Sequence, residues 1–268
     1  MKIDNKIITK LNKCSNKYAI ITGGTGRIGG IFINLLLNSG CKVISLSRRK
    51  NEFNTFKKDL SPKLQKKLSW YSFDITKNES INKLVSFINK KNIKVDLLIN
   101  NAAPSARGED FKYNENFLLN EFMGVLGGSI LLTEKLLPII RKNKFSKIIN
   151  VGSVWGIKAQ RRKVYLEMDI GPSIMTSAGK SGILNFTKFL AAREAKFGIT
   201  VNSLIPGWFP RPGPVQREDY ISNICSNIPL GRIGKIDDLI SPISFLLSDG
   251  SKYYTGQSLI VDGGSTIW

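Results

Sequence analysis

Short apolar runs alternate with longer amphipathic stretches along nearly the whole chain. The runs are rich in Ile, Val and Leu and read as strands, at residues 18–22, 42–47, 68–74, 95–100, 147–153, 199–206 and 258–264. The amphipathic stretches between them predict helices, at residues 31–40, 81–91, 116–141 and 181–198. Because parallel strands need long crossover connections, this order predicts an α/β fold: a doubly wound parallel sheet of about seven strands with helices on both faces.

The chain shows no linker, repeat or low-complexity segment that would divide it. We predict an N-terminal extension over residues 1–16 and a single domain over residues 17–268. The longest apolar stretch, FMGVLGGSILLTEKLLPII, is interrupted by Glu134 and Lys135, so no membrane span is expected. The basic N-terminus lacks the apolar core of a secretion signal, and we expect a cytoplasmic protein.

The amino-acid composition excludes several kinds of catalytic and metal-binding site. The chain has no histidine, which excludes Ser-His-Asp and Cys-His nucleophilic systems. Its three cysteines, Cys14, Cys41 and Cys225, form no C-x-x-C pair, so neither a disulfide framework nor a metal site is expected. A general acid must then be a tyrosine, lysine, cysteine or carboxyl group.

The chain is strongly basic, with 40 Lys and Arg against 20 Asp and Glu and a formal charge of +20. Such a charge attracts polyanions, phosphorylated metabolites or acidic membranes. The lysines are scattered along the sequence, without a long basic block or interleaved aromatic residues. This pattern favours a solvated lysine-rich surface over a nucleic-acid-binding face, and the small-molecule substrate is the expected partner.

A glycine-rich turn, TGGTGRIGG at residues 22–30, joins the first predicted strand to the first predicted helix. Glycines let the backbone approach a pyrophosphate, and a helix N-terminus supplies free N–H groups. A purely structural turn is the alternative, but the position after the first strand favours dinucleotide binding. The candidate residues are Gly23, Thr25, Gly26, Arg27, Ile28 and Gly29.

The end of the second predicted strand indicates which dinucleotide is bound. An acidic residue there would bind a ribose 2′-hydroxyl and select NAD(H). This chain instead has Ser47, Arg48 and Arg49, and guanidinium groups suit a 2′-phosphate. NADP(H) is therefore the predicted cofactor, and a plain basic loop is the alternative.

Taken together, the motifs resemble those of the short-chain dehydrogenases/reductases. The matching segments occur in that family's order and span residues 17 to 266: TGGTGRIG, FDI, NNAA, INVGS, VNSLIPG and YTGQSLIVDGG. The resemblance implies a Rossmann-like fold and an oxidoreductase activity. It also implies further cofactor contacts at Asp74, Ile75, Asn100, Ala102, Ala103, Pro206 and Gly207.

The resemblance implies a catalytic group as well. Ser153 resembles the serine that hydrogen-bonds the substrate, and Lys180 resembles the lysine that holds the nicotinamide ribose and lowers the pKa of a catalytic tyrosine. That tyrosine lies four residues before the lysine, where this chain has Thr176. An aliphatic hydroxyl has a pKa well above the ~10 of a phenol, so Thr176 is no equivalent acid, although it can position a water.

A second departure falls in the long helix, where the active-site asparagine of the family corresponds to Val125. Loss of an unneeded site is one interpretation, and a substitute acid is the other. The segment between Ser153 and Thr176 is longer than usual and resembles members that act on acidic sugars or nucleotide-sugar precursors. Its candidates are Tyr165, Glu167 and Asp169 for the acid and Arg161, Arg162 and Lys163 for an anionic group, against a plain surface loop.

The segment after Gly207 resembles the substrate-covering region of the family. Trp208 and Phe209 suit stacking on a ring, and Arg211 suits an anionic group. The leading hypothesis is an NADP(H)-dependent oxidoreductase acting on a hydroxyl/carbonyl pair of a polar, sugar-like or anionic substrate. The alternative is a catalytically impaired member that serves as a cofactor-binding partner or regulatory subunit.

The helix over residues 116–141 is apolar nearly all round. Either it is buried within one subunit, or one face needs cover from another copy. The resemblance implies a homodimer or homotetramer built on this helix and the one that carries Lys180.

Overall fold

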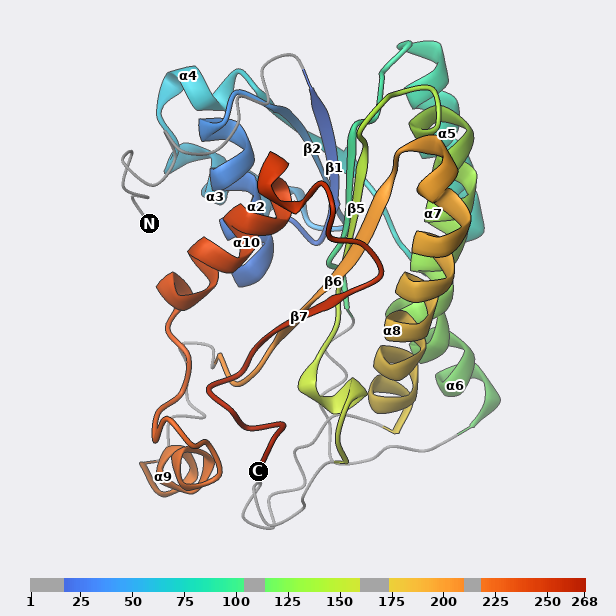
Figure 1. The fold of residues 1–268 in the computed structure, drawn as a ribbon. Coiled ribbons are helices and arrows are strands. Elements are labelled where there is room, and N and C mark those ends of the chain that lie inside the picture. The colour runs from blue at the N-terminus through green and yellow to red at the C-terminus, as the bar shows by residue number, and fades with distance from the viewer. Residues whose placement is uncertain (1–16, 104–113, 160–173, 210–217) are drawn as a thin grey trace.

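The protein contains one seven-stranded sheet, seen in a computed structural model that describes residues 17–103, 114–159, 174–209 and 218–268. The strand order is β3-β2-β1-β4-β5-β6-β7, and every neighbouring pair is parallel (Figure 1). The strands are β1 (Tyr18–Thr22), β2 (Lys42–Ser47), β3 (Leu68–Ser72), β4 (Leu97–Asn100), β5 (Lys147–Val151), β6 (Thr200–Pro206) and β7 (Ser258–Val261). The predicted α/β fold with a seven-stranded doubly wound sheet is confirmed.

Helices lie on both sides of the sheet (Figure 1). One side carries α2 (Arg27–Asn38), α3 (Lys50–Lys58), α4 (Pro62–Gln65) and α10 (Ile240–Leu247). The other side carries α5 (Asn78–Lys90), α6 (Glu115–Phe122), α7 (Gly128–Ile140) and α8 (Ile174–Glu194), while α9 (Glu218–Ser226) lies apart from both groups. A π-helical segment, η1 (Met123–Gly127), joins α6 to α7. Short 3-10 turns are η2 (Val154–Gly156), η4 (Ala195–Phe197), η5 (Ile236–Leu239) and η6 (Asp249–Ser251).

The core has two layers because the sheet is covered on both faces. Successive strand residues point to opposite faces, so Ile20 packs in one apolar cluster and Ile21 in the other. The layer beside α2 and α10 includes Phe32 and Ile243, which are fully buried. The layer beside α5, α7 and α8 is filled by residues that are also fully buried, among them Leu84, Leu136 and Leu190.

The predicted helix over residues 116–141 is a continuous helical run, Glu115–Ile140, with a π-helical segment, η1, at its centre. By length and composition this run is apolar enough to cross a membrane, but 61% of its most apolar stretch is buried inside the domain. That burial is what a core helix of a globular domain shows. Helices α3 and α4 and the position of α9 were not predicted from the sequence.

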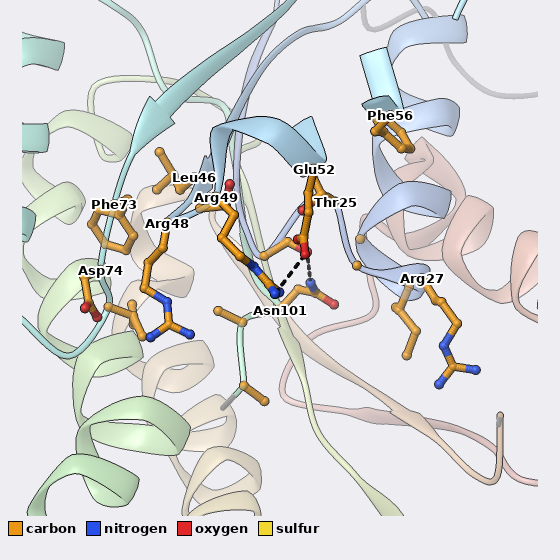
Figure 2. A pocket seen from close by; sticks show the side chains of 18 of the residues that line it. Thr25, Arg27, Leu46, Arg48, Arg49, Glu52, Phe56, Phe73, Asp74 and Asn101 are labelled. Carbon is orange, nitrogen blue, oxygen red and sulfur yellow. Dashed lines mark hydrogen bonds and ion pairs between the residues drawn. The ribbon is translucent and has the colours of Figure 1, made fainter. Parts of the chain in front are cut away.

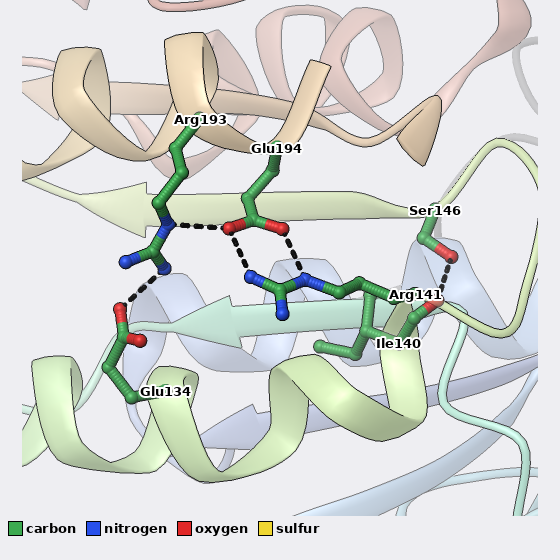
Figure 3. Close-up of polar contacts among 6 residues, drawn as sticks. All are labelled: Glu134, Ile140, Arg141, Ser146, Arg193 and Glu194. Carbon is green, nitrogen blue, oxygen red and sulfur yellow. Dashed lines mark hydrogen bonds and ion pairs between the residues drawn. The ribbon is translucent and has the colours of Figure 1, made fainter. Parts of the chain in front are cut away.

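A charged network joins the ends of α7 and α8 (Figure 3). The Glu194 side chain is fully buried, and its two oxygens accept bonds of 2.7 Å from Nε and Nη2 of Arg141. Arg193 donates to Glu194 at 2.6 Å and to Glu134 at 2.7 Å. The Arg141 hydrogen bond is the main cause that holds the pKa of Glu194 below its usual value of 4.5.

We expect Glu194→Gln to lower the free energy of unfolding by about 2–3 kcal/mol at neutral pH, because two guanidinium groups lose their shared carboxylate. The pKa of Glu194 is lowered by folding, so its stabilisation is present above pH 4.5 and is lost as the pH falls through the folded value. Urea unfolding at neutral and acidic pH measures this difference. Glu79→Gln, at an exposed pair with Lys83, is the control and should change little; an equal effect of both would contradict the account.

Candidate active site and cofactor cavity

The glycine turn lies at the carboxyl end of β1, where the chain enters α2. Gly23 has a φ of +63°, which only glycine adopts without strain, and its N–H donates to the carbonyl of Leu46 at 2.9 Å. A Cβ added at Gly29 would lie 2.4 Å from the carbonyl oxygen of Gly23. The N-cap of α2 is Gly26, which has no side chain to cap the helix, and the N-terminus of a helix presents its N–H groups to an anion.

A buried threonine ties this turn to the end of β4. The Thr22 hydroxyl accepts from the N–H groups of Asn101 at 3.0 Å and Ala102 at 2.9 Å. The Asn101 amide in turn donates to the carbonyls of Thr22 at 3.0 Å and Gly23 at 2.9 Å. These four bonds fix the glycine turn against the β4 segment and shape one wall of a cavity.

That cavity has a volume of about 850 Å³ and opens at the carboxyl edge of the sheet (Figure 2). It brings together most of the cofactor residues expected from the sequence: Gly23, Thr25, Gly26, Arg27, Ile28, Gly29, Ser47, Arg48, Arg49, Asp74, Ile75, Ala102 and Ala103. Gly23 and Gly29 leave room for close approach, and Asp74 and Ile75 lie at the end of β3. The residues present therefore fit an adenine dinucleotide.

The arginines after β2 differ in their partners. Arg49 pairs with Glu52 at 2.9 Å, the ion pair drawn in Figure 2. Within the described residues Arg48 forms no ion pair, and its guanidinium lies on the same side of the cavity as Asp74 (Figure 2). Arg48 is thus the cation at this wall best placed to receive an anionic group.

The residues expected to be catalytic follow β5 and begin α8. The Ser153 hydroxyl accepts from the N–H of Trp155 at 3.2 Å, in the turn that starts η2. Lys180 is buried, and its ammonium donates to the carbonyl of Val151 at 2.7 Å. Burial lowers the pKa of Lys180 to about 8. Thr176 is half-buried on α8, one turn before Lys180.

Close backbone contacts hold these elements together. A Cβ added at Gly156 of η2 would lie 2.8 Å from the carbonyl carbon of Lys180, and the Ser181 hydroxyl donates to the Gly156 carbonyl at 2.9 Å. On the other side of α8, a Cβ at Gly179 would lie 2.7 Å from a methyl group of Val125. The buried Val125 therefore faces α8 beside Lys180. Its correspondence to the asparagine of the family stays a prediction.

An aromatic cluster stands over the turns after β5 and β6. The rings of Trp155 and Trp208 meet edge-on with centroids 5.6 Å apart, and those of Trp208 and Tyr220 with centroids 6.3 Å apart. Trp208 and Phe209 do not line the large cavity; they line a second cavity of about 210 Å³. Several candidate substrate and acid residues lie outside the described residues: Tyr165, Arg211, residues 161–163, Glu167 and Asp169.

The lining of this cavity does not include four other expected cofactor residues: Asn100, Lys180, Pro206 and Gly207. Asn100 is buried and donates to the Thr133 hydroxyl at 2.9 Å and to the Asn150 side chain at 2.8 Å. In this structure Asn100 therefore joins β4 to β5 and α7. Its contact with a ribose stays a prediction.

Sequence reasoning missed several residues that shape the cavity, above all Asn101, Glu52 and Phe56. Asn101 is part of the NNAA segment, so its place in that motif was the available signal. Glu52 and Phe56 belong to α3, a short polar helix with one buried residue, and its sequence carries no motif that would place these two side chains at the site.

We expect Lys180→Met to change how stability depends on pH. The folded-state pKa of about 8 lies below that of an unfolded lysine, so the ammonium destabilises the fold below pH 8. That penalty disappears as the pH rises toward ~10.4, and wild-type stability should gain about 1–3 kcal/mol relative to Lys180→Met between about pH 7 and pH 10. Urea unfolding at both values measures the gain. Lys188→Met, at an exposed lysine of the same helix, should show none, and parallel pH profiles for wild type and Lys180→Met would refute the buried ammonium.

Known proteins resemble this chain over nearly its full length. Residues 28–266 match the family described as enoyl-(acyl carrier protein) reductase. The chain is 28% identical over 267 residues to a 7α-hydroxysteroid dehydrogenase of Bacteroides fragilis, covering 96% of this chain and 97% of that protein. It is 29% identical over 249 residues to a 3-oxoacyl-[acyl-carrier-protein] reductase of Haemophilus influenzae, covering 92% and 97%.

A solved structure agrees with these matches. A short-chain dehydrogenase from Leptospira borgpetersenii with bound NAD+ superposes with a TM-score of 0.82 at 29% identity, covering 99% of this chain and 97% of that one. The parallel sheet, the glycine turn before α2 and the family match over residues 28–266 lead to one conclusion. The chain belongs to the short-chain dehydrogenase/reductase family.

Proposed function

We propose that the protein is an NADP(H)-dependent oxidoreductase that acts on a hydroxyl/carbonyl pair of a polar, sugar-like or anionic small molecule. The observation that carries this proposal is the large cavity, where Arg48 follows β2 without an ion pair among the described residues, and Ser47 stands where NAD-selective proteins place an acid. The similarity to a hydroxysteroid dehydrogenase and an oxoacyl reductase supports a hydroxyl/carbonyl reaction.

The cofactor would be held by separate parts of the cavity wall. The N–H groups at the start of α2 would bind the pyrophosphate, Arg48 the 2′-phosphate, and Asp74 with Ile75 the adenine side. The Glu52 carboxylate also lines the cavity, but its pairing with Arg49 offsets its repulsion of a phosphate. When bound, a reduced nicotinamide supplies a hydride to a carbonyl carbon.

The protein must then supply a proton to the carbonyl oxygen. The Ser153 hydroxyl can orient that oxygen by hydrogen bonding, and Thr176 can hold a water but is too weak an acid to replace a phenol. The ammonium of Lys180, whose pKa is about 8, is acidic enough to deliver the proton near neutral pH, directly or through that water. In this proposal Lys180 replaces the missing tyrosine as the source of the proton.

A catalytically impaired, cofactor-binding partner is the second candidate. The apolar Val125 against Gly179 and the threonine at residue 176 favour it, because both replace polar groups of the family's catalytic set. The two candidates share cofactor binding and differ in turnover. With either function, the protein is expected to form a homo-oligomer. The exposed apolar side chains of α6 and α8, such as Leu119 and Phe189, would lie in its interface.

We expect Arg48→Ala to weaken NADPH binding by about 10- to 100-fold, because a charge-assisted contact with the 2′-phosphate is lost. The affinity for NADH should change less than threefold, which corresponds to less than about 0.6 kcal/mol of binding free energy. Energy transfer from tryptophan to the bound nicotinamide measures both affinities. A matched Lys50→Ala variant, at a basic residue two positions further along that does not line the cavity, should bind NADPH as the wild type does. An equal loss for both cofactors would contradict the assignment.

We expect Thr176→Tyr to raise carbonyl reduction by NADPH by about 100-fold or more, since a phenol beside Lys180 is a far better proton donor than a threonine. Turnover of a panel of ketoses and other ketones, followed by NADPH absorbance, measures the change. Thr176→Phe adds the same bulk without a hydroxyl and should give no gain. If wild type already turns over and Thr176→Tyr slows it, the site does not follow the family's proton-transfer geometry.

A further inference from the structure

The end of the sheet opposite the cofactor cavity is strongly basic. In a parallel sheet every helix-to-strand connection returns to the amino ends of the strands, so six such connections gather at this edge. With the residues at their borders they carry exposed lysines, which we call the basic edge: Lys42, Lys66, Lys90, Lys91, Lys94, Lys142, Lys144, Lys196 and Lys252. Lysines that are scattered along the sequence are therefore neighbours in the fold.

Few acids offset this charge. Within the connections themselves the carboxylates are Asp96 and Asp249. Asp96 accepts from the N–H of Tyr18 at 2.9 Å, and Asp249 pairs with Lys252 at 2.8 Å. Within the described residues, no lysine of the basic edge other than Lys252 forms an ion pair, so the edge attracts a polyanion.

The register of the sheet arranges these cations in a row. The N–H of Val43 bonds to Lys67, that of Lys42 to Lys17, and that of Lys147 to Asp96, so the strand starts lie side by side. Seven strands at about 4.8 Å spacing make a row of roughly 29 Å. A row of this length matches a charged chain better than a single small anion.

Three exposed aromatic rings stand at one end of the row. Phe145, Phe197 and Tyr253 precede the adjacent strands β5, β6 and β7, with exposed fractions of 59%, 37% and 104%. Phe145 also has a φ of +61°, a left-handed conformation that is unfavourable for a bulky residue. An exposed ring held at a backbone cost is a feature of recognition sites.

Cationic side chains already lie against two of these rings, Phe145 and Phe197. Lys252 lies 5.4 Å from the centroid of Phe145, and Phe197 has Lys196 at 5.3 Å and Arg141 at 4.7 Å. Insertion of these rings into lipid would strip the cations of water, which is costly. A nucleobase can stack on a ring while its phosphate meets the neighbouring cation, so both groups are satisfied at once.

We propose that the basic edge binds single-stranded nucleic acid, with phosphates along the lysine row and bases on Phe145, Phe197 and Tyr253. The sequence alone favoured a merely solvated lysine surface, because the clustering arises only from the fold. This edge is opposite the cofactor cavity, so the proposal is independent of the enzymatic one.

The test is fluorescence anisotropy of a labelled oligouridylate of about 12 nucleotides. Binding should weaken about 50-fold between about 50 and 200 mM salt if four phosphates are neutralised. Lys144→Glu with Lys196→Glu should bind at least tenfold more weakly and flatten the salt dependence. The control, Lys188→Glu with Lys235→Glu, makes the same charge change at exposed lysines elsewhere and should retain wild-type binding to within about threefold.

The aromatic part has its own variants. Phe145→Asn removes the ring while keeping a residue that tolerates positive φ, and should weaken binding about tenfold with an unchanged salt slope. Tyr253→Ala, at a fully exposed side chain, should fold in any case and weaken binding about fivefold. NADPH binding should be the same in all variants.

Three results would overturn the proposal. The first is that the control pair of substitutions weakens oligonucleotide binding as much as the pair at the basic edge, which would mean that binding depends only on overall charge. The second is wild-type affinity in both aromatic variants. The third is tighter binding to phosphatidylserine vesicles than to the oligonucleotide, which would assign the edge to a membrane surface.

Discussion

The architecture depends on one constraint: all seven strands are parallel, so every turn that leaves a strand lies at one edge of the sheet and every turn that returns lies at the other. The leaving turns bring the glycine turn, Arg48, Asp74 and the Ser153 turn to the carboxyl edge. The returning turns bring lysines from six separate connections to the amino edge. One topological rule thus produces both surfaces to which we assign a function.

Within the carboxyl edge, polar bonds between neighbouring strands convert topology into a shaped site. The Thr22 hydroxyl and the Asn101 amide join the glycine turn to β4, so the turn keeps the left-handed Gly23 that a close backbone approach needs. Lys180 is fixed in a comparable way by the Val151 carbonyl and by η2 packed on its backbone. Its burial lowers the pKa of the lysine into the range useful for proton transfer, in a site where residue 176 is a threonine.

The strands and the glycine turn were predictable from the sequence because each is a local pattern. A run such as KVISLS is continuous and β-branched and coincides with β2, and a glycine cluster after a strand has few other uses. Helix α3 was missed because it is short and mostly polar and buries only Phe53, so its sequence lacks the apolar run that marks a core helix. The role of Asn101, the pKa of Lys180 and the basic edge depend on which strands are neighbours, and no local pattern contains that information.

We propose that this family member selects a 2′-phosphorylated adenine dinucleotide through the wall that carries Arg48. Titration calorimetry with 2′,5′-ADP and with 5′-ADP tests it directly, because neither fragment contains the nicotinamide and the outcome does not depend on catalysis. The account predicts that 2′,5′-ADP binds at least tenfold more tightly and that its advantage shrinks with added salt. Equal binding of the two fragments, or a preference for 5′-ADP, would contradict it.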